Sequence, residues 1–214
     1  MIDLAHSLKC KSFTFASSSS VYGNSKKREK KEDDKENPIS PYGNSKFSFE
    51  KYAQILSEFY NLKTTGIRFF NVFGPNQNPE GVYSAVIPRW VSRLSKNKKI
   101  FLNGDGTTSR DFTYVDNAIN GLILAAKNKS NYIFNIFNIA CNSEISLNYL
   151  LNKIILNLGL EKKKIKIKYN DFKKGDIKRS KANINKAKKT LKYKILINFD
   201  NGLRKYINLI KSTK

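Results

Sequence analysis

The most constraining feature of this chain is a tyrosine and a lysine four residues apart, Tyr42 and Lys46, at the start of a predicted helix. Ser40 suits the N-cap of that helix, and Pro41 suits its first position. Apolar residues then recur at close to helical spacing across residues 47–60. We therefore expect Tyr42 and Lys46 to lie one above the other, where an ammonium group stabilises a phenolate. Such a pair can act as a general base near neutral pH, although a surface pair on an ordinary helix is the alternative.

A run of four serines, Ser17–Ser20, precedes this helix. Residues 12–16 have the pattern of a short buried strand, which would place the serines at its carboxyl end. Ligands collect at the carboxyl ends of strands in open α/β sheets, so the serines stand where chemistry is expected. Taken alone, however, a serine-rich turn is the better explanation.

Several stretches together carry a resemblance to a known family. They are SSSSVYG with SPYGNSK, then RFFNVFGP at residues 68–75, then GDGTTSRDFTYVD at residues 104–116. Tyr-x-x-x-Lys after a serine-rich strand end resembles the active-site pattern of the short-chain dehydrogenase/reductase superfamily. The whole set resembles the extended branch of that superfamily, the NAD-dependent epimerase/dehydratase family. The resemblance covers the chain from about residue 11 to its end.

The resemblance implies a catalytic set of Ser18, Tyr42 and Lys46, of which the last two would also contact the cofactor NAD. It also implies a substrate site in which Asn71 hydrogen-bonds the nucleotide sugar and Arg110 grips the pyrophosphate. A guanidinium fork suits that task in charge and geometry. The other implied substrate-binding residues are Ser19, Ser20, Ala85, Val86, Trp90, Phe101, Asn103, Lys173, Asp176 and Ser180. No metal ligands are implied.

Further details of the implied site distinguish possible substrates. Phe101 and Asn103 would lie near the uracil and ribose, and Asp176 would reach the ribose or nucleotide. Lys173 stands where many relatives carry an arginine, so the charge is kept but bidentate geometry is lost. Ser180 stands where galactose-type epimerases often carry a bulky tyrosine, and a small residue leaves room for an N-acetyl group.

The implied function is NAD-dependent 4-epimerisation of a UDP-sugar through a 4-keto intermediate, most closely as in UDP-N-acetylglucosamine 4-epimerases. Ser180 and the stretch AVIPRW at residues 85–90 favour UDP-N-acetylglucosamine and UDP-N-acetylgalactosamine. Trp90 within that stretch is as good a candidate for a core residue as for a substrate-lining one. UDP-glucose or UDP-glucuronate 4-epimerase is the nearest alternative, and an inactive fragment is another.

The expected fold is α/β, with the C-terminal part of a Rossmann-like parallel sheet and a small α/β substrate-binding domain. Residues 1–75 would form a partial Rossmann-like domain with the catalytic set. Residues 76–214 would be mainly substrate-binding, with some segments returning to the sheet. Because the chain has no G-x-x-G-x-x-G turn, we expect roughly a hundred residues of a dinucleotide-binding half to be absent from this fragment. The expected assembly is a homodimer through the Tyr42 helix, or a pair with a separate chain that supplies that half.

The chain is strongly basic, with 40 Lys and Arg against 17 Asp and Glu and a net charge of +23. Concentrated basic charge would indicate nucleic-acid binding, but the lysines are spread over many segments and no motif supports that function. Two cysteines form no metal or disulfide pattern, no apolar run could span a membrane, and the N-terminus lacks an apolar signal region. We therefore expect a cytoplasmic protein without nucleic-acid or membrane partners.

Four local expectations concern loops, caps and edges. Residues 24–37 are polar and charged, so we expect an exposed loop without chemistry. Asp116 and Ser146 each precede a helical pattern and are expected to cap it. Residues 165–169 alternate as an edge strand would.

Overall fold

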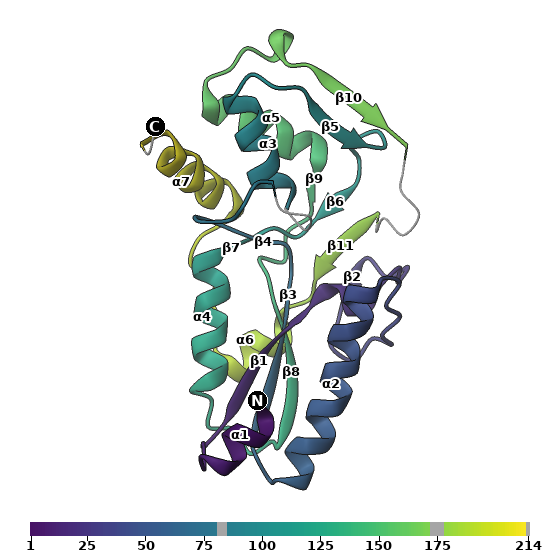
Figure 1. The fold of residues 1–214 in the computed structure, drawn as a ribbon, viewed down its shortest axis with the longest axis vertical. Helices are drawn as coiled ribbons and strands as arrows, with labels where there is room; N and C mark the ends of the chain where they lie inside the picture. The colour runs from purple at the N-terminus through teal and green to yellow at the C-terminus, as the bar shows by residue number, and fades with distance from the viewer. Residues whose placement is uncertain (81–84, 172–177, 213–214) are drawn as a thin grey trace.

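The computed structural model describes residues 1–80, 85–171 and 178–212. Its lower half in Figure 1 is built on a parallel sheet in the order β1-β3-β8, with α2 and α4 on opposite sides. The bounds of these elements are β1 Phe13–Ser18, β3 Thr64–Phe69, β8 Phe134–Ile139, α2 Pro41–Phe59 and α4 Val115–Ala126. Two further helices, α1 Ile2–Ser7 and α6 Asn185–Leu191, accompany this sheet.

The central strand of this sheet requires a glycine. A Cβ atom on Gly66 would lie 2.4 Å from Cδ1 of Ile136 and 2.7 Å from the ring of Phe15. These distances are far below van der Waals contact, so a larger residue at position 66 would force the ends of the Ile136 and Phe15 side chains to shift.

Helix α2 begins where its local sequence predicts. The Ser40 hydroxyl accepts a 3.0 Å hydrogen bond from the Gly43 amide, and Pro41 occupies the first turn. The hydroxyl therefore satisfies one of the amide groups that a helix start leaves without a partner.

The upper half of Figure 1 holds a second apolar core. Strands β5 Ile100–Asn103 and β10 Ile167–Asn170 pair in parallel, and α3 Val86–Ser95, α5 Leu147–Leu158 and α7 Phe199–Ser212 pack together with them. The predicted cap at Ser146 is confirmed, because its hydroxyl accepts from the Tyr149 amide at 3.1 Å. Within the described residues β10 pairs only with β5, as expected of an edge strand.

Short strands connect the two halves. A sheet in the order β2-β11-β6-β9 contains β2 Glu29–Lys30, β11 Arg179–Ala182, β6 Ser109–Arg110 and β9 Ile145–Ser146. A second pair joins β4 Val72–Phe73 to β7 Thr113–Tyr114. The arrangement confirms the predicted α/β class with a Rossmann-like parallel sheet.

Two local expectations are wrong. The segment 24–37 is not simply an exposed loop, because Lys30 lies in β2 and both Lys30 and Asp34 are buried. Asp116 does not cap its helix: α4 begins at Val115, and Asp116 forms a 3.0 Å ion pair with Lys205 instead. The strand β11 that pairs with Lys30 and the Lys205 that pairs with Asp116 are both distant in sequence, whereas Asp34 is held by the nearby Lys27 and Lys31.

In the part of the chain that the structure describes, no helix is long and apolar enough to cross a membrane. Both cysteines are free; Cys10 is exposed and Cys141 is buried.

Candidate active site

The three predicted catalytic residues lie on two neighbouring elements. Strand β1 ends at Ser18, and the 3-10 turn η1 Ser19–Tyr22 follows it. The Ser18 hydroxyl oxygen accepts two hydrogen bonds from Ser20, one from its backbone amide at 3.2 Å and one from its hydroxyl at 2.9 Å. A Cβ atom on Gly43 would lie 2.8 Å from the Ser20 carbonyl oxygen. The first turn of α2, which carries Tyr42, therefore abuts the serine turn.

Lys46 lies one helical turn from Tyr42, as predicted. Its Nζ atom is 5.8 Å from the centroid of the Tyr42 ring. The same Nζ donates a 3.0 Å hydrogen bond to the Ala16 carbonyl oxygen in β1. Tyr42 is 48% exposed. A phenol and an ammonium group on one exposed helical face form a donor set suited to a ribose and a reacting hydroxyl.

A cavity of about 660 Å³ is lined mainly by α3, β5, α5 and β10 of the upper half, together with Arg110 of β6 and Asn71 from the turn after β3. This volume is within the range of small-molecule sites. Its lining residues are far apart in sequence, from Asn71 just after β3 to Asn170 in β10. Its lining includes these predicted substrate residues: Asn71, Ala85, Val86, Trp90, Phe101, Asn103 and Arg110.

Hydrogen bonds fix parts of this lining. The Trp90 indole donates to the Phe101 carbonyl oxygen at 3.1 Å, which ties α3 to β5. The Asn71 amide group donates to the Asp111 carbonyl oxygen at 3.1 Å, and Asn71 has a positive φ of 36°. Asparagine tolerates that conformation better than most residues, which is consistent with its position at a sharp turn after β3.

The remaining predicted residues are placed as follows. Ser180 is buried in β11 and pairs in register with the lining residue Arg110 of β6, but Ser180 is not itself among the described residues that line the cavity. Ser19 and Ser20 form the η1 turn and are not among the described residues that line the cavity. Lys173 and Asp176 lie outside the described residues.

The cavity also contains residues that the sequence did not reveal. They are Arg89, Thr108, Phe112, Leu147 and Asn170. For Arg89 there was a signal, because it is one helical turn from Ala85 inside the AVIPRW stretch. Asn170 gave none, because only the parallel pairing of β10 with β5 brings it opposite Asn103. Arg89 and Arg110 give the cavity a positive character that suits a phosphorylated ligand.

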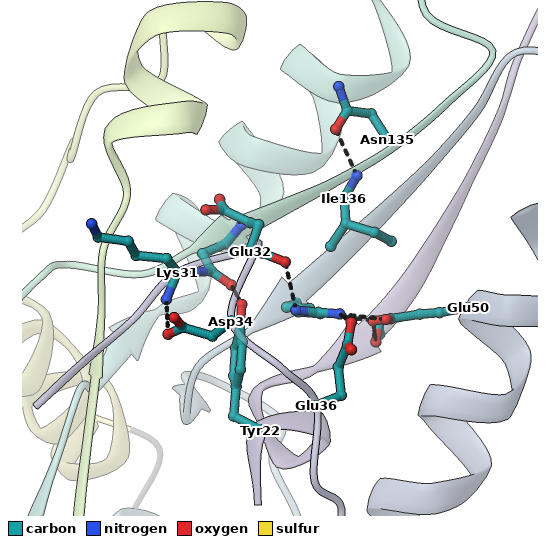
Figure 2. Close-up of polar contacts among 11 residues, drawn as sticks. Tyr22, Lys31, Glu32, Asp34, Glu36, Glu50, Asn135 and Ile136 are labelled. Atoms are coloured by element: carbon teal, nitrogen blue, oxygen red, sulfur yellow. Dashed lines mark hydrogen bonds and ion pairs between the residues drawn. The ribbon is translucent and has the colours of Figure 1, made fainter. Parts of the chain in front are cut away.

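A buried ionic network joins the parallel sheet to α2, and Figure 2 shows Glu50 and Glu36 within it. Arg68 of β3 binds Glu50 of α2 through both carboxylate oxygens, at 3.0 and 2.7 Å. Its guanidinium also donates to a Glu36 carboxylate oxygen at 2.6 Å and to the Glu32 carbonyl oxygen at 3.4 Å. Ser17 donates its hydroxyl proton to Glu50. The network therefore ties β1, α2 and the segment 24–39 to β3.

The electrostatics of the network follow from burial and pairing. Burial opposes the charge of Arg68, but hydrogen bonds to Glu50 outweigh it and hold the arginine pKa above its usual value. Burial also opposes ionisation of Glu36, but the bond to Arg68 lowers its carboxyl pKa. For Glu32, burial prevails over the bond from the Asn138 amide and raises the carboxyl pKa.

Among the residues that the structure describes, no three His, Cys, Asp or Glu side chains are arranged to hold a metal ion. The donor set instead suits an organic cofactor at Tyr42 and Lys46 and a nucleotide in the cavity.

Comparison with known proteins gives consistent matches. Residues 1–140 match the model of the NAD dependent epimerase/dehydratase family. A UDP-glucuronate 4-epimerase of Thermodesulfobacterium geofontis is 31% identical over 221 residues, spanning 100% of this chain and 66% of that protein. The UDP-N-acetylglucosamine 4-epimerase of Methanobrevibacter ruminantium M1, solved in complex with UDP-N-acetylmuramic acid, is 33% identical with a TM-score of 0.90, covering 98% of this chain and 66% of that one.

A third match was solved with a cofactor. The UDP-glucuronic acid 4-epimerase from Bacillus cereus, in complex with UDP-glucuronic acid and NAD, is 28% identical with a TM-score of 0.89 and covers 100% of this chain and 65% of that chain. The present chain thus spans just under two thirds of the length of these relatives.

Proposed function

Because this chain belongs to the NAD-dependent epimerase/dehydratase family, we propose that it provides the catalytic and substrate-binding part of a UDP-sugar 4-epimerase. The observation that carries this proposal is the combination of two sites: an exposed Tyr42 with Lys46 beside the serine turn, and a nucleotide-sized cavity lined by Asn71 and Arg110. Two relatives that match over nearly all of the chain are named as UDP-sugar 4-epimerases, which supports the proposal.

In the proposed mechanism, Tyr42 takes the proton from the sugar 4-hydroxyl as the hydrogen on C4 leaves as hydride. NAD+, when bound, supplies the reversible hydride acceptor for this step. Lys46 holds the nicotinamide ribose and stabilises the Tyr42 phenolate. Ser18 hydrogen-bonds the reacting oxygen. The 4-keto sugar would then turn in the site, and Tyr42 would return the proton to the 4-oxygen while the bound cofactor would supply the hydride to the other face of C4.

The substrate we favour is UDP-N-acetylglucosamine, with UDP-N-acetylgalactosamine as product. The small Ser180 beside Arg110 leaves room for an acetamido group near the cavity. UDP-glucose and UDP-glucuronate remain the second candidates, because relatives named for glucuronate match at a similar identity. The cytoplasm, where nucleotide sugars and free thiols coexist, is the proposed compartment.

The proposed partners complete the site. Within the described residues β1 pairs only with β3, so its outer edge is available to a further parallel strand. We propose that a dinucleotide-binding half pairs with that edge. A second copy of this chain is proposed to pack on the exposed face of α2. If neither partner forms, an inactive fragment is the alternative.

The test is an epimerisation assay. The chain is incubated with NAD+ and UDP-N-acetylglucosamine, alone and with the purified dinucleotide-binding half of a related 4-epimerase, and UDP-N-acetylgalactosamine is quantified. Tyr42→Phe serves as the inactive control, and parallel reactions contain UDP-glucose or UDP-glucuronate. We expect turnover of the acetamido sugar in the mixture. No turnover of any UDP-sugar, beside an active intact relative, would refute the proposal.

A further inference from the structure

Asp111 is a buried carboxyl group between two residues that line the cavity. Arg110 and Phe112, its neighbours in the chain, both contribute to the lining. The Asp111 residue itself is 0% exposed and is not among the described lining residues. A fully buried carboxyl group is costly unless hydrogen bonds compensate it, so its partners indicate what it does.

Those partners are backbone amides from two other segments. Oδ1 accepts from the Cys141 amide at 3.1 Å, just after β8. Oδ2 accepts from the Ala182 amide at 3.1 Å, at the end of β11. One side chain thus joins the carboxyl end of the main sheet to the strand that pairs with β6.

The backbone of Asp111 holds a third segment. Its carbonyl oxygen accepts from the Asn71 amide group at 3.1 Å. The Asn71 carbonyl oxygen in turn accepts from the Thr113 amide at 3.2 Å. Two hydrogen bonds, one from the Asn71 side chain and one to its backbone carbonyl, therefore hold the turn after β3 to the segment that Asp111 anchors. Asn71 has a positive φ in this turn.

We propose that Asp111 is a positioning residue for the nucleotide cavity, holding Arg110 and Asn71 where a UDP diphosphate and sugar would meet them. The inference rests on the proposed function and adds a residue that contacts no ligand itself. In the Asp111→Asn variant, one of the two accepting carboxylate oxygens becomes an NH2 group. That group is a donor, and it would face the N–H donor of a backbone amide. That leaves a buried donor without a partner, and the segment carrying Arg110 must shift to relieve it.

Trp90 makes the test direct, since it is the only tryptophan and it lines the cavity. Its fluorescence is titrated with UDP in the wild type, in Asp111→Asn and in the control Asp116→Asn, an outward-facing carboxylate in the same segment. We expect UDP affinity to fall about ten- to a hundredfold in Asp111→Asn and to stay unchanged in the control.

A second measurement needs no substitution, in case Asp111→Asn does not fold. Cys141 and Ala182 are not among the described residues that line the cavity. A ligand in the cavity would therefore not cover their backbone amides directly. If Asp111 couples them to the cavity, UDP must slow their hydrogen exchange, because coupling between sites is reciprocal. Unchanged exchange in UDP-saturated protein would overturn the inference.

The outcomes separate the two proposals. If the wild type does not bind UDP, both fail. If it binds UDP and the folded Asp111→Asn variant binds equally well, only the positioning role fails and the proposed function stands. Weaker binding by that variant, with UDP-dependent protection of Cys141 and Ala182 in the wild type, supports both.

Discussion

Gly43 shows how closely single residues set the distance between the two catalytic elements. An alanine Cβ there would lie 2.8 Å from the Ser20 carbonyl oxygen, a backbone atom that cannot turn away. In an exposed helix, a glycine-to-alanine substitution raises the free energy of unfolding by up to about 1 kcal/mol. Here we expect Gly43→Ala instead to lower the free energy of unfolding by about 1–3 kcal/mol, because α2 must move away from η1. Urea denaturation measures the change.

The matched control for Gly43→Ala is Ser48→Ala, an exposed position in the same helix. It should change stability by less than about 0.5 kcal/mol. A stabilised Gly43→Ala variant would show that α2 does not press on the serine turn.

Asp111 should make the free energy of unfolding depend on pH, with a sign that follows from its pKa. Burial raises its carboxyl pKa to about 7, against the opposing bonds from the Ala182 and Cys141 amides. The unfolded chain titrates near pH ~4. Because the folded pKa is the higher one, the contribution to stability is fully present below pH ~4 and is lost as the pH rises through about 7. From about pH 5 to pH 8 the wild type should therefore lose stability relative to Asp111→Asn, as measured by denaturation at each pH; parallel curves would contradict this.

Among the elements, β3 and α2 depend on each other through one buried ion pair. Arg68→Met would leave Glu50 buried without its cation, and we expect a loss of about 3–5 kcal/mol in the free energy of unfolding. The double variant with Glu50→Gln should recover part of that loss, since it removes the uncompensated charge. Denaturation of both variants measures this coupling.

The control for Arg68 is another paired arginine. Arg28→Met breaks an exposed bond to Glu144, for which we expect less than about 1 kcal/mol. Proteolysis within segment 24–39 should also speed up in Arg68→Met, because the guanidinium anchors Glu36 and the Glu32 carbonyl. Equal stability losses in the two variants would argue against a central role for the Arg68 network.

Whether an element or contact could be predicted from the sequence depends on how far apart its partners lie along the chain. Helix α2 and its Ser40 cap were predictable because the deciding contacts lie within four residues. The RFFNVFGP motif singled out Asn71, and the structure places it in the turn after β3. The Arg68–Glu50 pair was not predictable, because its partners are 18 residues apart on different elements and charged residues are common in this chain. The burial of Lys30 was missed because β2 pairs with β11, about 150 residues further along the chain.

At the scale of the whole molecule, surface composition points to an assembly. Exposed apolar side chains recur along the outward face of α2, with Ile55 65% and Phe59 78% exposed. Tyr52 and Phe49 continue this face toward Tyr42. Contiguous apolar surface of this kind marks an interaction site more often than chance, and a symmetric pair buries the same face on both copies.

The double variant Ile55→Glu/Phe59→Glu therefore tests the proposed homodimer. Two like charges placed on each copy would face each other across a two-fold axis, so the pair should dissociate to monomers in sedimentation velocity. Leu209→Glu, an exposed apolar position on α7, is the control and should leave the mass unchanged. Because α2 carries Tyr42 and Lys46, loss of the dimer should also lower activity in the mixture with a dinucleotide-binding half. A double variant that sediments like the wild type would assign the apolar face to another partner.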